Sequence, residues 1–104
     1  MLKRRSRSSA RGVTVIRVAD QSVTEAHRAM LSRASAVHER AAAVHERAAE
    51  LHEQAAALHD QHALEFADWP DIVRRSQRQA NHERELEARE RSLADRQRQA
   101  ARLS

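Results

Sequence analysis

The chain has 104 residues, of which 33% are charged, a formal net charge of +4, and only one Gly, one Pro, one Phe and one Trp. This length allows one domain at most, and because much of the apolar content is Ala, which buries little area, we expect an extended helical protein rather than a compact globule. Cysteine is absent, which excludes disulfides, thiolate metal sites and cysteine nucleophiles.

The first 21 residues read as a basic, mostly disordered arm. Residues 1–17 contain six basic side chains and no acid. We regard these as candidates for binding phosphate groups of nucleic acid, although anionic lipid or an acidic protein surface would satisfy the same charges. A solubilising tail is the plain alternative. The six candidates are Lys3, Arg4, Arg5, Arg7, Arg11 and Arg17.

Within this arm lies a short β-favouring run, Val13 to Val18, which can stay extended, pair with another molecule or be absorbed into a helix. It is too short for a secretory signal and contains Arg17. No apolar run approaches the roughly 20 residues of a membrane span, so we expect a cytoplasmic protein.

A long helix is predicted over residues 22–67. Ser22 and Glu25 match a capping box at its start. No Gly or Pro interrupts the strong helix formers that follow, and such a helix would be about 70 Å long.

Within this helix the phrase "VHERAAAVHERAAELHEQAAALHDQHAL" repeats a seven-residue unit four times. A sustained apolar period of 3.5 residues predicts a coiled-coil seam against another helix, supplied by this chain, a second copy or a different protein. Ala in alternate layers lets the two backbones approach closely. The predicted partner-binding seam consists of Val37, Ala41, Val44, Ala48, Leu51, Ala55 and Leu58.

In this frame the histidines beginning with His38 flank the seam as solvated imidazoles, and the acids beginning with Glu39 face solvent. Arginines such as Arg40 lie on the other flank. Two copies would then lack acid–base complementarity, and a partner with acidic flanks would complement the helix better.

A break is predicted over residues 68–71, because Trp69 precedes Pro70 and the residue before proline is disfavoured in the α region. Asp68 is the expected cap of the next helix, and Phe66 with Trp69 the expected apolar plug of the corner. The second, charged helix covers residues 71–104 and carries two neighbouring apolar rows, one with Ile72 and Leu86 and one with Val73 and Ala80. The fold class is therefore all-α, with two long helices in a hairpin or a kinked rod; the hairpin is favoured because it buries both stripes.

Catalytic chemistry has no support in the sequence, which has no Gly-rich phosphate loop and no nucleophile elbow, so we expect neither an enzyme nor a cofactor. We also expect no metal site. The nearest approach to one is His59 with His62, three residues apart, which would need further ligands from another chain.

The "HERAA" heptads of residues 37–57 resemble those of small uncharacterised helical proteins of actinobacteria. The resemblance covers the repeat only and implies no activity. The sequence thus predicts a non-enzymatic helical interaction or scaffold protein. The alternative is a nucleic-acid-binding accessory protein, in which the coil dimerises and the basic arm binds phosphate.

Overall fold

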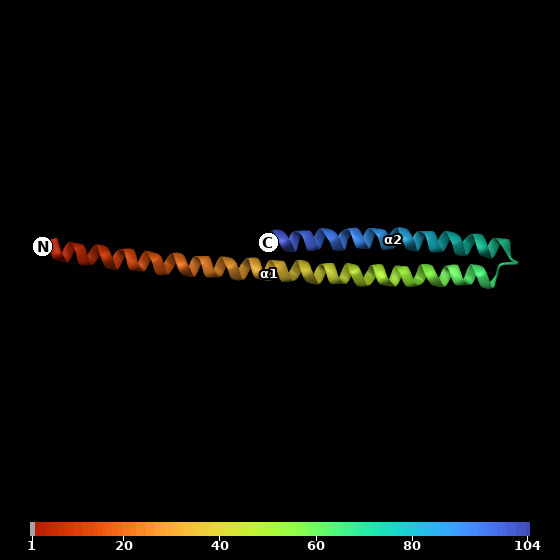
Figure 1. The fold of residues 1–104 in the computed structure, drawn as a ribbon, viewed down its shortest axis with the longest axis horizontal. Coiled ribbons are helices and arrows are strands. Elements are labelled where there is room, and N and C mark those ends of the chain that lie inside the picture. Colours follow the sequence, from red (N-terminus) through yellow and green to blue (C-terminus); the bar gives the residue numbers. More distant parts are fainter. Residues whose placement is uncertain (1) are drawn as a thin grey trace. The chain divides into compact units, whose positions relative to one another are not determined.

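The computed structural model describes the backbone of residues 2–104 and the side chains of residues 20–104. The backbone forms two helices, α1 (Leu2–Glu65) and α2 (Pro70–Leu103), joined by a short turn (Figure 1). The chain divides into two compact units, Met1–Ala34 and Ser35–Ser104. The predicted all-α class with two long helices is confirmed.

Helix α1 begins at Leu2, whereas the sequence predicts a start at Ser22 after a largely disordered arm. The Thr24 hydroxyl donates to the carbonyl oxygen of Asp20 at 2.9 Å, a bond between residues four apart inside a helix. Ser22 is therefore an interior residue and not an N-cap. Extending an existing helix gains one hydrogen bond per residue without a new nucleation event, so the β-favouring run Val13 to Val18 is absorbed into the helix.

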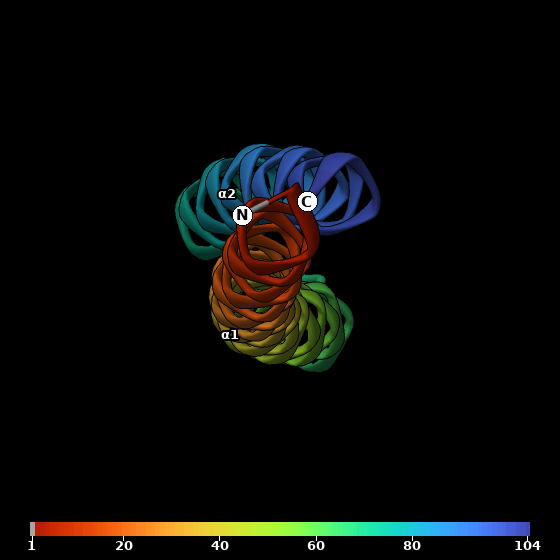
Figure 2. The same cartoon turned by 90° about the vertical axis from the view of Figure 1, so that its left-hand side faces the viewer.

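The second unit is an antiparallel helical hairpin, formed by the end of α1 and by α2. Helix α2 runs alongside the yellow-to-green part of α1 (Figure 1), and the end-on view shows it on one side of α1 (Figure 2). His38 bonds to Gln97, and His45, seven residues further along α1, bonds to Glu90, seven residues back along α2. This antiparallel register selects the hairpin over the kinked rod.

The core of the hairpin consists of small side chains. All of its buried residues are at most 6% exposed, and these are Ala42, Ala49, Ala56, Ser76, Ala80, Ala94 and Ala101. Side chains of this size let the two helix axes approach closely, as the sequence predicts. The buried row on α1 lies one residue after the predicted row of Ala41, Ala48 and Ala55, so within the hairpin α2 covers a neighbouring row and not the predicted one.

The corner between the helices depends on Pro70. Trp69 has extended dihedral angles (φ −115°, ψ 90°), as expected before proline, and it is the N-cap residue of α2. No side chain caps this helix, so the predicted capping role of Asp68 is wrong. The backbone N–H of Trp69 instead donates to the carbonyl oxygen of Phe66 at 2.9 Å and closes the turn. Trp69 remains 62% exposed, so it does not form the predicted apolar plug.

Candidate docking face of the hairpin

The histidine row of α1 faces α2. The Nδ1 atoms of His45 and His52 lie 2.6 Å from Glu90 Oε2 and 2.5 Å from Glu83 Oε2, and His38 Nδ1 lies 2.7 Å from Gln97 Oε1. The side chains of the two His–Glu pairs are 22–30% exposed. The prediction that this row consists of solvated flanking imidazoles is therefore wrong. The histidines alternate with the buried Ala row and supply the polar half of the seam between the helices.

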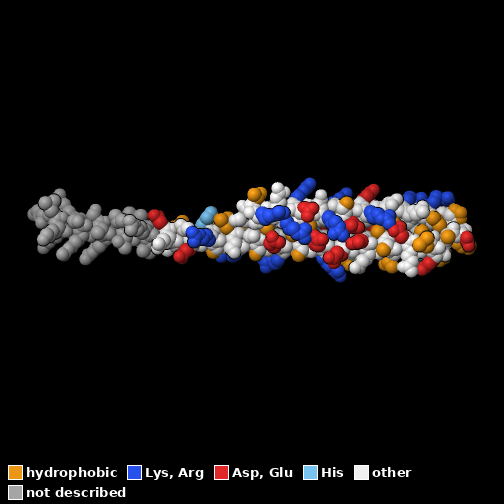
Figure 3. Space-filling model, in the orientation of Figure 1, with side chains coloured by type: hydrophobic (Ala, Val, Ile, Leu, Met, Phe, Trp, Pro, Cys, Tyr) orange, Lys and Arg blue, Asp and Glu red, His pale blue; other side chains and the backbone are white. Residues whose placement is uncertain are grey.

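One edge of the hairpin is closed by ion pairs. Arg98 donates to Glu46 at 2.7 Å, and Arg91 donates to Glu46 at 3.2 Å and to Glu53 at 3.1 Å. Arg84 pairs with Asp60 further along the same edge. Figure 3 shows acidic and basic side chains interspersed along the line between the two helices. Three of the acids predicted to face solvent, Glu46, Glu53 and Asp60, are thus partners of α2.

These contacts shift the proton affinity of Glu46. The hydrogen bond from Arg98 lowers the pKa of the Glu46 carboxyl group, and the positive charges of Arg98 and Arg91 lower it further. The carboxyl group of Glu46 therefore stays ionised to lower pH than a glutamate without these partners.

On the opposite edge, α2 leaves the predicted seam uncovered. Val37 is 54% exposed, Val44 67%, Leu51 49% and Leu58 66%. The alanines between them, beginning with Ala41, are half-buried. These side chains alternate at steps of four and three residues, which is the spacing of a coiled-coil seam. Helix α1 consequently carries two neighbouring rows with this spacing, and α2 covers only one of them.

Helix α2 adds a second apolar row to the same edge. Leu93 lies one residue before the buried Ala94, just as Ala48 lies one residue before the buried Ala49. In an antiparallel pair, positions with this same offset on the two helices share one edge. The row on α2, half-buried throughout, consists of Ile72, Leu86, Leu93 and Ala100. We call this row together with the predicted seam the open face.

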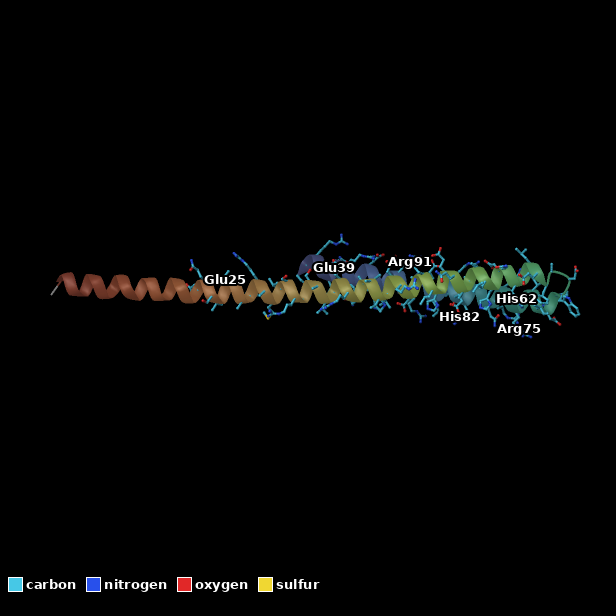
Figure 4. The ribbon with its side chains drawn as sticks, turned by 90° about the horizontal axis from the view of Figure 1, so that it is seen from below. Glu25, Glu39, His62, Arg75, His82 and Arg91 are labelled. Atoms are coloured by element: carbon cyan, nitrogen blue, oxygen red, sulfur yellow. The ribbon has the colours of Figure 1, made fainter. Side chains whose placement is uncertain are left out.

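Figure 4 agrees with this assignment. Glu39 and Arg91 lie along one edge of the hairpin, which is the ion-paired edge. Arg75 and His82, which neighbour the α2 row of the open face, lie along the other edge. The ion-paired edge and the open face are therefore on opposite sides of the helix pair.

Basic side chains border the open face on both helices. Arg40 and Arg47 border it on α1, and Arg75, Arg89 and Arg96 border it on α2; all five are exposed. Arg47 pairs with Glu50 at 3.2 Å. Among the described side chains, the other four have no ion-pair partner. Unlike Arg91 and Arg98, these four arginines are thus not neutralised by an ion pair within the described side chains.

A hollow of about 370 Å³ interrupts the α2 side of this face close to the corner of the hairpin. It opens where the polar Gln79 replaces the apolar residue expected between Ile72 and Leu86. Its lining is mostly basic or imidazole, and it consists of His59, Arg75, Arg78, Gln79, His82 and Glu83.

His59 and His62, the weak candidates for metal binding, have other surroundings. The ring of His62 packs against that of Phe66 with centroids 4.6 Å apart, while His59 lines the hollow. Among residues 20–104, no three His, Asp or Glu side chains gather closely enough to hold a metal ion. The six phosphate-binding candidates between Lys3 and Arg17 lie outside the side chains that the structure describes.

Comparison of the chain with protein-family models, with curated proteins and with solved structures gives no match. Within the described residues, neither helix has a stretch that is both long and apolar enough to cross a membrane.

Proposed function

We propose that this protein is a non-enzymatic helical interaction protein that docks a further helix on the open face of its hairpin. The observation that carries the proposal is the exposure of Val37, Val44, Leu51 and Leu58, each 49–67% exposed at a strict spacing of seven residues. An apolar row with this period packs best against another helix with the same period.

Covering the apolar side chains of this face would contribute free energy to a complex. Full burial of a Val or Leu side chain contributes about 1.5–3 kcal/mol relative to exposure. Covering the exposed half of each side chain in two rows therefore yields several such increments, from which the cost of association is subtracted. Residues 37–58 span about 32 Å along the helix. A partner helix of about six turns would therefore cover them.

The hairpin supports docking because it is already closed. Ala49 and Ala94 are fully buried and the His–Glu pairs are formed without any partner. A docking helix therefore meets an ordered surface and does not have to organise it, which reduces the entropy cost of binding.

Site-specific photo-crosslinking tests the proposal. A photoreactive residue at Leu51 is expected to give a crosslinked product in the native host, with a second copy or with another protein. The same residue at the exposed Ala57, which lies outside the open face, is the matched control and is expected to give none. Leu51→Asp should abolish the association while circular dichroism remains helical, because it places an unpaired charge in the new seam.

Two results would count against the proposal: equal crosslinking from both positions, or association that survives Leu51→Asp. Deleting residues 1–17 separates docking from any nucleic-acid binding by the basic arm. Docking should be unaffected by this deletion, since all residues of the open face lie in the unit Ser35–Ser104.

A further inference from the structure

We infer that the open face is built for an amphipathic helix whose apolar stripe is flanked by acidic residues, an inference that rests on the proposed docking function. The two edges of the hairpin differ in whether their arginines form ion pairs. On the closed edge, Arg91 and Arg98 are neutralised by Glu46 and by neighbouring carboxylates. On the open face, Arg40, Arg89 and Arg96 point to solvent without such partners.

The unpaired charges along the border of this face are all basic. Between Val37 and Leu58 on α1, the border of the face is formed by Arg40 and Arg47, followed by Gln54. On α2 the border is formed by Arg75, His82, Arg89 and Arg96. A helix with Glu or Asp on both flanks of its apolar stripe would place carboxylates beside both borders.

A second copy of the chain fits this face less well. Its own open face would bring Arg40 and Arg47, or Arg89 and Arg96, against the same basic borders. Like charges at such flanking positions are destabilising in either helix direction. The borders therefore select against self-association and for an acidic partner.

The lining of the hollow near the corner also favours an acidic side chain of the partner. His59, His82, Arg75 and Arg78 contribute donors to its lining, and the only carboxylate there belongs to Glu83. The Oε2 atom of Glu83 is engaged by His52 at 2.5 Å. A carboxylate projecting from the partner helix would find donors in this hollow where the apolar row of α2 is interrupted.

Binding of two synthetic helical peptides to the full chain tests the inference. Both peptides have about four heptads with the same Leu and Ile seam, and one carries Glu at its flanking positions while the other carries Lys. We expect the Glu peptide to bind at least about tenfold more tightly at low salt, with the difference shrinking as the salt concentration rises. Fluorescence anisotropy of labelled peptides gives both affinities.

Charge reversal provides the sharper variant test. Arg89→Glu combined with Arg96→Glu should reverse the preference in favour of the Lys peptide. The control, Arg74→Glu combined with Arg102→Glu, makes the same change in net charge on the side of α2 away from the open face and should leave the preference for the Glu peptide intact. Circular dichroism of both double variants establishes that the hairpin is folded.

The outcomes distinguish this inference from the proposed function. Equal affinity for both peptides, reduced by Leu51→Asp, would overturn the acidic partner and leave docking standing. Binding of neither peptide, together with self-association that Leu51→Asp abolishes, would assign the face to a second copy and overturn the inference alone. Binding of neither peptide, with no association through Leu51 of any kind, would overturn both.

Discussion

His45 Nδ1 lies 2.6 Å from Glu90 Oε2 across the hairpin, between two helices whose buried side chains are mostly alanine. The same kind of contact recurs seven residues away, where His52 meets Glu83. A seven-residue repeat alone leaves the register of two helices poorly specified, because a slip of one heptad is nearly silent. Here a slip in one direction would bring His52 opposite Ser76 in place of Glu83, and a slip in the other direction would bring His45 opposite Gln97 in place of Glu90.

Each His–Glu pair should stabilise the hairpin through the interaction between its two side chains. Glu90→Ala leaves His45 half-buried without its acceptor, so we expect a loss of about 1–2 kcal/mol in the free energy of unfolding. A double-mutant cycle with His45→Ala isolates the interaction, with an expected coupling of about 1 kcal/mol measured by urea denaturation. Additive effects of the two substitutions would show that the pair contributes nothing to stability.

Adjacent alanines should differ sharply in their tolerance of larger side chains. Ala49 is fully buried between the helices, whereas Ala48 is half-buried at the edge of the open face. We expect Ala49→Leu to destabilise the hairpin by about 1–3 kcal/mol, because the extra volume forces the helices apart. The control Ala48→Leu should change stability by less than about 0.5 kcal/mol. A larger effect from Ala48→Leu would show that the row of Ala48, and not that of Ala49, packs between α1 and α2.

Acid should weaken the ion-paired edge through Glu46. Because the bond from Arg98 lowers the pKa of Glu46 in the folded state, its contribution is complete above the ordinary glutamate pKa of about 4.3 and is lost as the pH falls below it. Melting temperatures followed from pH 6 down to pH 3 should therefore fall more steeply in the wild type than in Glu46→Gln. Parallel curves for the two proteins would show that this pair does not contribute.

Pro70 should shape the corner without being needed for the hairpin. Pro70→Ala releases Trp69 from its extended conformation and adds freedom to the unfolded chain, at a cost of about 0.5–1 kcal/mol. We expect spin labels at Gln54 and Asn81 to stay close in this variant, at a distance set by an interhelical spacing of about 10 Å and the label arms. A shift to about 40 Å, the span of 27 residues in one continuous helix, would show that proline alone enforces the hairpin.

The sequence predicts the fold well, because Pro70 and the helix formers on either side of it act locally. It does not predict which seam α2 covers. The runs of three alanines beginning at Ala41 and Ala55 make two neighbouring frames available, and apolar size alone favours the frame with Val and Leu.

A signal for the observed frame is nevertheless present on α2. Glu83 and Glu90 recur at seven residues and match the His row, and Arg84, Arg91 and Arg98 match the acidic row of α1. Only a comparison of polar rows between the two helices reveals it.

The start of α1 at Leu2 shows another limit of sequence reasoning. Ser22 and Glu25 satisfy the pattern of a capping box, yet that pattern describes a helix start only where the preceding residues are not helical. Here the helix is already formed before Ser22, so the same residues lie within its interior.

Methyl NMR of the full chain during titration with the Glu-flanked peptide tests most directly whether the open face binds a helix while the hairpin stays closed. The methyl signals of Val44, Leu51 and Leu93 should shift and show cross-relaxation to the peptide, because these side chains lie on the open face. The methyl signals of Ala49 and Ala94, buried between the helices, should stay in place. Shifts centred on Ala49 and Ala94, with Val44 and Leu51 unperturbed, would contradict the account, because the partner would then be displacing α2 from the seam it occupies.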